Sequence, residues 1–274
     1  MWIAARRSRP SETEAGAGRE RRRAGAAFGA IRSAADGVLA VVFAPRCAAC
    51  DHLLDAPTRG PVCEACWASL RPLAPPLCDR CGDQIPSWRT TSLAGGLCAR
   101  CRRKPHLVAR CRAFGSYDGQ LRLIIHALKY DKRRSLARRL ALLMRERGAD
   151  VLADADCLVP VPLHWRRLRV RGFNQAADLA AGLGLPVARA LRRVRPTRPQ
   201  AELPASRRYH NLRGAFAPAR RPGRRRAVVG KCVVLVDDVF TTGATLDGCA
   251  RVLKAAGARE VRALTVARAV SRPR

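Results

Sequence analysis

Two adjacent carboxylates followed by a threonine-rich loop are the residues of this chain best suited to chemistry. The apolar run Val233–Val236 leads into Asp237 and Asp238, and the segment Thr241–Thr245 follows. A buried parallel strand places ligands at its C-terminal end, where the amides of a small-residue loop bind a terminal phosphate. Carboxylates beside that loop accept hydrogen bonds from sugar hydroxyls and help to hold a hydrated Mg²⁺. The pattern therefore predicts a site for a sugar phosphate.

Four Cys-x-x-Cys pairs lie between residues 47 and 101. Each pair can place two thiolates at one side of a tetrahedron, and two pairs joined by a short loop complete a four-sulfur zinc site. Two structural zinc ions are predicted, with sequential pairing favoured because it closes the shorter loops, and cross-braced pairing open. Disulfides are the alternative, disfavoured because no export signal is present. The predicted ligands are Cys47, Cys50, Cys63, Cys66, Cys78, Cys81, Cys98 and Cys101.

A cluster of arginines follows the strand expected over residues 156–162. Residues 163–175 are interpreted as a loop that leads into a helix, and they include Arg166, Arg167, Arg169 and Arg171. Guanidinium groups bind phosphate oxygens through paired hydrogen bonds, so this loop could hold a pyrophosphate opposite the two carboxylates. Solvated arginines without a ligand are the alternative.

Apolar periodicity predicts the elements that must position these groups. Strands are expected over residues 110–117, 156–162, 227–229, 233–236 and 261–266. Helices are expected over residues 121–130, 135–147, 176–183 and 246–253. Such a set is typical of a parallel sheet covered by helices on both faces. Residues 195–216 are polar and broken by proline, and we expect a mobile functional loop there.

Length and composition limit the class of protein. A chain of 274 residues, 48% of them apolar, can bury a full α/β core beside a small second domain. No apolar run approaches the roughly 20 residues that span a bilayer, and no signal peptide is recognised, so a cytoplasmic protein is expected. The net charge of +32 predicts binding of polyanions that weakens as salt rises. A general arginine richness of the chain is the alternative explanation.

The acidic strand and its loop resemble the phosphoribosyl pyrophosphate (PRPP) loop of the type I phosphoribosyltransferases. The order of motifs along the chain resembles the ComF family, through the paired zinc ribbons, Leu128–Tyr130, Val161–Leu163, Arg171–Gln175, Thr197, Gln200, Arg208 and Asn211. Residues 1–27 lack apolar periodicity and are expected to form a disordered basic tail. An amphipathic helix and a double zinc ribbon are then expected over 28–109. The resemblance implies a type I phosphoribosyltransferase-like α/β domain over 110–274.

The resemblance also implies roles for individual residues. Asp237 and Asp238 would bind the ribose hydroxyls and Mg²⁺, and Arg171 would approach the pyrophosphate. Arg208 would close over the site from the mobile loop. The 5′-phosphate would be held by Thr241, Thr242, Gly243, Ala244 and Thr245.

Three functions remain open. ComF-type proteins are associated with natural transformation, so the first is a PRPP-binding protein that assists cytoplasmic handling of single-stranded DNA, in peripheral association with the uptake machinery. The second is an active phosphoribosyltransferase with an unidentified nucleobase-like acceptor. The third is a PRPP-sensing regulator. No element for reading a nucleobase is recognised in the sequence, which weighs against the second.

Overall fold

The computed structural model describes residues 29–85, 87, 95–103, 106–196 and 212–269. The chain divides into two compact units, one ending at Cys63 and the other beginning at Glu64. In the first unit, residues 29–43 form the expected helix before the first cysteine pair. The predicted tail over 1–27 lies outside the described residues, as do Thr197, Gln200, Arg208 and Asn211.

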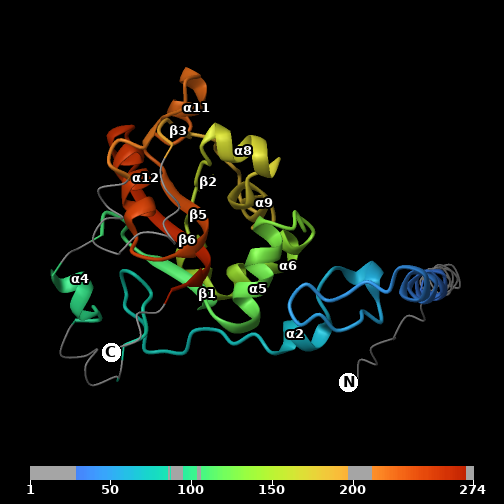
Figure 1. Cartoon of the computed structure of the whole chain (residues 1–274). Coiled ribbons are helices and arrows are strands. Elements are labelled where there is room, and N and C mark those ends of the chain that lie inside the picture. The colour runs from blue at the N-terminus through green and yellow to red at the C-terminus, as the bar shows by residue number, and fades with distance from the viewer. Residues whose placement is uncertain (1–28, 86, 88–94, 104–105, 197–211, 270–274) are drawn as a thin grey trace, which may run out of the picture. The chain divides into compact units, whose positions relative to one another are not determined.

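A four-stranded parallel sheet in the order β1-β6-β5-β2 forms the core of the second unit (Figure 1). Its strands are β1 (Cys111–Ser116), β2 (Cys157–Pro160), β5 (Cys232–Phe240) and β6 (Glu260–Arg268). These confirm four of the five expected strands. Asp237 on β5 pairs in register with Thr265 on β6, while the pairing of β5 with β2 ends at Val236, so the acidic end of β5 extends past β2 and is flanked on its β6 side.

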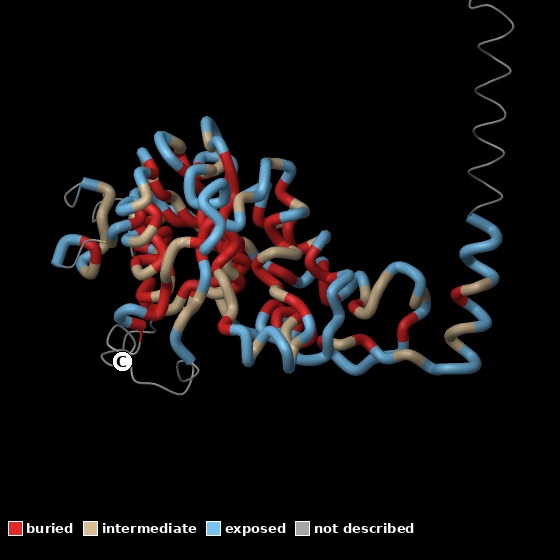
Figure 2. The backbone as a smooth tube through the Cα atoms, turned by 90° about the horizontal axis from the view of Figure 1, so that it is seen from above, coloured by how far each residue is buried: buried red, intermediate tan, exposed pale blue. Residues whose placement is uncertain are grey.

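Helices cover both faces of this sheet. Figure 1 shows α5 (Gly119–Lys129), α6 (Leu136–Arg147) and α9 (Gln175–Ala181) on one side and α12 (Ala244–Ala255) on the other. The strands between them are largely buried (Figure 2), because β2 and the first half of β5 carry apolar side chains toward both layers. The α/β class predicted from the sequence is therefore confirmed. The shorter helices are η1 (Pro57–Arg59), α2 (Glu64–Ala68), α4 (Ala99–Arg103) and α7 (Ala149–Leu152).

The expectation of a loop over residues 163–175 is wrong, because the structure forms α8 (Trp165–Arg171) there. His164 precedes the helix, and its ring nitrogen accepts a hydrogen bond from the Arg166 amide at 3.4 Å. Gly172, with φ of 84°, ends the helix in the left-handed conformation. Local capping thus turns the arginine-rich segment into two turns of helix, and the arginines project from it in different directions.

The expected strand over residues 227–229 is also wrong. These residues form a turn after α11 (Pro222–Arg226), and Gly230, with φ of 71°, redirects the chain into β5. Local hydrogen bonds, from the Val229 amide to the Arg226 carbonyl and from the Lys231 amide to the Val228 carbonyl, close this turn in place of strand pairing. A two-stranded antiparallel sheet, which the sequence did not indicate, is formed by β3 (Leu191–Arg193) and β4 (Phe216–Pro218).

Candidate functional site

A cavity of about 190 Å³ lies at the carboxyl end of β5. Its acidic wall contains Asp237 and Asp238, and the loop that follows adds Thr241 and Thr245. The rest of the lining combines apolar residues and Gln175 with basic and aromatic side chains, which are those of Tyr117, Lys129, Tyr130, Arg167, Arg171 and Arg193. Negative and positive groups therefore face the same small space, at the sheet edge where parallel α/β proteins bind ligands.

Asp238 is held by side chains from two helices. Lys129 Nζ at the end of α5 lies 2.7 Å from Asp238 Oδ1, and Gln175 Nε2 at the start of α9 donates to Asp238 Oδ2 at 2.6 Å. Arg171 Nη1 donates in turn to Gln175 Oε1 at 2.5 Å. Burial disfavours the charged lysine, but the Asp238 carboxylate more than compensates and raises the pKa of Lys129. Asp238 is therefore an oriented hydrogen-bond acceptor beside a buried ammonium group.

Asp237 has a different electrostatic environment. Burial of its carboxyl group, together with the charge of neighbouring Asp238, raises the pKa of Asp237 to about 7. The Asp238 amide donates to Asp237 Oδ1 at 2.9 Å and opposes this shift, as do the charges of Lys129 and Arg193. Asp237 is thus partly protonated near neutral pH, and a bound cation would favour its ionised form.

The loop after β5 leads directly into the N-terminus of α12, the kind of position at which helices bind anions. Gly243 adopts φ of 81° immediately before α12, a conformation that favours glycine. A Cβ at this position would lie 2.5 Å from His106 Cε1, so the space also excludes a side chain. Thr241 and Thr245 line the cavity, whereas Thr242 and Ala244 are buried behind it. The loop can therefore offer two hydroxyls and the amides of the first turn of α12.

The structure adds cavity residues to those predicted. Lys129 and Gln175 were not among the predicted site residues, although both fall within motifs that carry the family resemblance. Lys129 is one of only five lysines in an arginine-rich chain, which is a signal that could have identified it. Arg193 on β3 gave no local signal. Arg171 lines the cavity, while Arg208 lies outside the described residues.

Two groups of four cysteines have the geometry of zinc sites. The sulfurs of Cys47, Cys50, Cys63 and Cys66 lie within 4.8 Å of one another, and so do those of Cys78, Cys81, Cys98 and Cys101. Thiolates at about 2.3 Å from a tetrahedral zinc ion are about 3.8 Å apart. The distances from Cys50 to Cys63, 3.8 Å, and from Cys81 to Cys98, 3.7 Å, match that spacing. Both groups fit structural zinc, and the sequential pairing is confirmed.

Backbone amides surround the sulfurs. In the second group, the Cys98 amide donates to Cys78 Sγ at 3.3 Å. In the first, the Cys63 and Ala49 amides donate to Cys47 Sγ at 3.3 and 3.4 Å. Burial opposes ionisation, but these amides lower the pKa of Cys47 to about 7. The donors stabilise the thiolate form that zinc requires.

A basic and aromatic surface adjoins the cavity. We define the α8 surface as Trp165, Arg166 and Arg169 on α8, with Arg171 and Tyr130 beside them. Trp165 is 52% exposed, and the guanidinium carbons of Arg166 and Arg169 lie 5.4 and 4.9 Å from its ring centre. Tyr130 is 61% exposed, with the Arg171 guanidinium 5.3 Å from its ring centre. Both rings thus lie within the range of about 6 Å over which a guanidinium group is attracted to an aromatic face.

A larger cavity, of about 580 Å³, lies on the other side of α8. It shares Pro162, Leu163 and Arg193 with the cavity at β5, so the two adjoin. Its lining includes Trp165 and further arginines, namely Arg134, Arg189, Arg192, Arg220 and Arg224. The arginine-rich concave surface is therefore continuous with the predicted pyrophosphate end of the site. Among the helices of the described residues, none combines the length and apolar character that a bilayer crossing requires.

Comparisons with known proteins match both parts of the chain. A double zinc ribbon domain model matches residues 38–102, and a phosphoribosyl transferase domain model matches residues 169–274. DNA utilization protein YhgH of Salmonella typhi is 36% identical over 210 residues, which cover 73% of this chain and 87% of that protein. Competence protein F of Haemophilus influenzae is 30% identical over 239 residues, covering 82% of this chain and 97% of that protein. An orotate phosphoribosyltransferase structure from Aeropyrum pernix is 22% identical with a TM-score of 0.29, covering 54% of this chain and 76% of that one.

Proposed function

Because the chain belongs to the ComF family of competence and DNA utilization proteins, we propose that it binds PRPP with Mg²⁺ and assists the handling of single-stranded DNA. The observation that carries the PRPP proposal is the placement of Asp237 and Asp238 beside the phosphate-type loop, opposite a basic wall. A sugar phosphate has hydroxyls for the acids, one phosphate for the loop and, in PRPP, a pyrophosphate for the cations.

Each wall of the cavity has a distinct part in this proposal. The hydroxyls of Thr241 and Thr245, with the amides at the start of α12, suit the 5′-phosphate. The two carboxylates accept hydrogen bonds from the ribose hydroxyls, and Lys129 orients Asp238 for this. Arg167 and Arg171 supply positive charge for the pyrophosphate. Bound Mg²⁺ would neutralise pyrophosphate charge, which also assists departure of that group if transfer occurs.

The α8 surface supports the DNA part of the proposal. Bases of a single strand stack on exposed aromatic side chains, and arginines pair with the phosphates between them. Trp165 and Tyr130 provide such rings, each with a guanidinium group over it. The net charge of +32 adds a sequence-independent attraction to the same polymer. An unpaired strand suits this surface better than a duplex, because a duplex hides the faces of its bases.

Calorimetric titration tests the two ligands separately. Purified, zinc-replete protein is titrated with PRPP and Mg²⁺, and then with a short single-stranded oligonucleotide at two salt concentrations. We expect saturable PRPP binding that requires Mg²⁺, and oligonucleotide binding that weakens at the higher salt. Absence of any interaction with PRPP would contradict the proposal. Release of pyrophosphate in the presence of a nucleobase would instead identify an active phosphoribosyltransferase.

Replacing Trp165 by alanine is expected to lower the affinity for the oligonucleotide about tenfold, because a base loses its stacking partner. PRPP affinity should not change, since Trp165 does not line the β5 cavity. Fluorescence anisotropy with a labelled oligonucleotide measures the effect, and Trp165→Phe should retain most of the affinity. Leu142→Ala is a matched control, because Leu142 on α6 is also 52% exposed. Equal losses in the two alanine variants would exclude stacking on Trp165.

PRPP affinity is expected to increase with pH around neutrality. Asp237, whose pKa is raised to about 7, must lose its proton before it can help to bind Mg²⁺. Affinity measured with Mg²⁺ should rise up to about tenfold per pH unit below about pH 7 and level off above about pH 8. Phosphate groups of the ligand titrate in the same pH range. The pH profile of Asp237→Asn, which lacks the carboxyl group, therefore gives the contribution of the ligand alone. If this variant shows the same pH profile as the wild type, the dependence does not arise from Asp237.

A further inference from the structure

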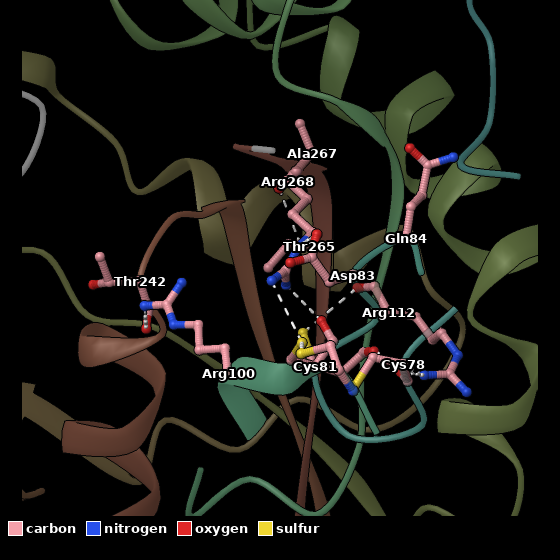
Figure 3. Close-up of polar contacts among 12 residues, drawn as sticks. Cys78, Cys81, Asp83, Gln84, Arg100, Arg112, Thr242, Thr265, Ala267 and Arg268 are labelled. Carbon is pink, nitrogen blue, oxygen red and sulfur yellow. Dashed lines mark hydrogen bonds and ion pairs between the residues drawn. The ribbon is translucent and has the colours of Figure 1, made fainter. Parts of the chain in front are cut away.

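The second zinc ribbon contacts the loop that follows β5. This ribbon contains Cys78, Cys81, Cys98 and Cys101, with α4 carrying the last of them. Arg100 lies on the same helix, and its guanidinium points toward Thr242 in the loop after β5, as Figure 3 shows. Arg100 Nη2 donates to the carbonyl oxygen of Thr242 at 3.0 Å. A residue between two zinc ligands thus holds the backbone of the predicted phosphate loop directly.

The segment after α4 makes a second set of contacts, with the start of α12. His106 Nδ1 lies 2.8 Å from Asp247 Oδ2, and the Leu107 amide donates to Asp247 Oδ1 at 2.9 Å. Asp247 lies in the first turn of α12, and its side chain is buried. The His106 ring also fills the space beside Gly243 and packs edge-on against Phe240, with ring centres 5.7 Å apart. His106 and Leu107, which follow the second zinc ribbon in the chain, therefore cover the side of the loop that does not line the cavity.

A third connection joins the ribbon to the ends of β5 and β6. Arg268, at the end of β6, is 1% exposed, and its Nη1 donates to the Cys81 carbonyl at 2.6 Å (Figure 3). Its Nη2 lies 3.4 Å from Cys81 Sγ, and its Nε donates to Asp83 Oδ1 at 2.8 Å. The same guanidinium lies 4.3 Å from the ring centre of Phe240, the last residue of β5. Phe240, which directly precedes the loop, is thus packed against the Arg268 guanidinium, and that guanidinium hydrogen bonds to the predicted zinc ligand Cys81.

From these contacts we propose that the second zinc ribbon positions the phosphate loop, with Arg100 and His106 as positioning residues. The ribbon holds the loop from behind at Phe240, Thr242, Gly243 and Asp247, while the cavity side stays open for ligand. Loss of zinc from the second site would release the segment that carries Arg100 and His106, and the loop with it. The inference rests on the proposed binding of PRPP for its effect on affinity, but the effect on loop order is independent of any ligand.

Substitution of Arg100 tests the proposal at one hydrogen bond. We expect Arg100→Ala to weaken PRPP binding about tenfold, since the loop carbonyl loses a charged donor. Arg100→Lys should recover part of that loss, because it keeps a donor and the charge. Arg102→Ala is the matched control, since Arg102 is an exposed arginine on the same helix. Zinc content and the thermal midpoint of unfolding should be unchanged in all three, and wild-type affinity in Arg100→Ala would overturn the proposal.

Amide hydrogen exchange of the full chain measures how well ordered the loop is in the absence of any ligand. In Cys98→Ala/Cys101→Ala, which removes the second zinc, the amides of residues 241–247 should exchange faster, while those of 233–236 stay protected. Cys47→Ala/Cys50→Ala, which removes the first zinc, should leave 241–247 unchanged. Arg100→Ala should also increase exchange in the loop relative to Arg102→Ala, a comparison that does not require the ribbon to unfold.

The two measurements separate the two proposals. If wild-type protein does not bind PRPP but the loop still depends on the second ribbon, the positioning inference holds and the PRPP proposal fails. If PRPP binds but residues 241–247 exchange equally in the wild type, Arg100→Ala and the second-site double variant, the positioning inference is wrong.

Discussion

Replacing Asp238 by asparagine is expected to lower the affinity for PRPP and Mg²⁺ by roughly a hundredfold or more. Asp238 has one carboxylate oxygen 2.7 Å from Lys129 Nζ and the other bonded to Gln175. The amide retains the shape but removes the charge that ribose hydroxyls and Mg²⁺ require, and each charged hydrogen bond contributes about 1.5–3 kcal/mol. It also leaves the buried Lys129 ammonium without its counter-charge. Calorimetry with PRPP at fixed Mg²⁺ measures the loss.

Two controls make this result specific. Asp154→Asn removes one exposed carboxylate that lines neither cavity described above, and it should bind PRPP like the wild type. Single-stranded oligonucleotide binding should persist in Asp238→Asn, because the α8 surface does not include Asp238. Arg171 and Tyr130 belong to both the α8 surface and the cavity, whereas Trp165, Arg166 and Arg169 do not line the cavity. Joint loss of both ligands in a folded variant would therefore contradict DNA contacts through Trp165, Arg166 and Arg169. Full retention of PRPP binding would exclude the acidic pair as the ribose site.

Replacing Arg268 by methionine is expected to cost about 3 kcal/mol of unfolding free energy, although methionine has a similar length. The Arg268 side chain is 2% exposed and hydrogen bonds to Asp83 and to the Cys81 carbonyl. Removing one partner of a buried ion pair leaves the other charge and the carbonyl unsatisfied. Because Arg268 also contacts a zinc ligand, zinc affinity at the second site should fall about 10- to 100-fold. Urea unfolding of zinc-replete protein and chelator competition measure the two effects.

Arg251→Met is the control for the Arg268 variant. Arg251 is an exposed arginine on α12, and the loss of one surface charge should change the unfolding free energy by less than about 0.5 kcal/mol. A small effect of Arg268→Met on both stability and zinc retention would show that the β6 end and the second ribbon are not energetically coupled. A loss of stability with normal zinc affinity would show that Arg268 stabilises the fold through its pair with Asp83 and does not affect zinc binding at Cys81.

Local patterns were sufficient wherever the chemistry lies within a short segment. Cys-x-x-Cys spacing predicted both zinc sites, because the knuckle and its ligands are consecutive in the chain. The apolar run before Asp237 predicted β5, and the small residues after it predicted the turn into α12. The same reasoning was wrong at residues 163–175 and 227–229. Helix caps at His164 and Gly172 produced α8 in the first segment, and the turn at Gly230 ended the second. A pattern of apolar and charged residues does not show which of these local effects prevails over hydrophobicity.

The sequence by itself determined the class of fold, the zinc ligands and the acids and loop of the candidate site, since each depends on neighbours along the chain. Only the tertiary structure decided what surrounds them. Arg100 contacts Thr242 across 142 positions and Arg268 contacts Cys81 across 187. Lys129 and Gln175 meet at Asp238 because the strand order brings α5 and α9 to the end of β5. Such pairings follow from strand order and packing, which no local spacing of residue types encodes.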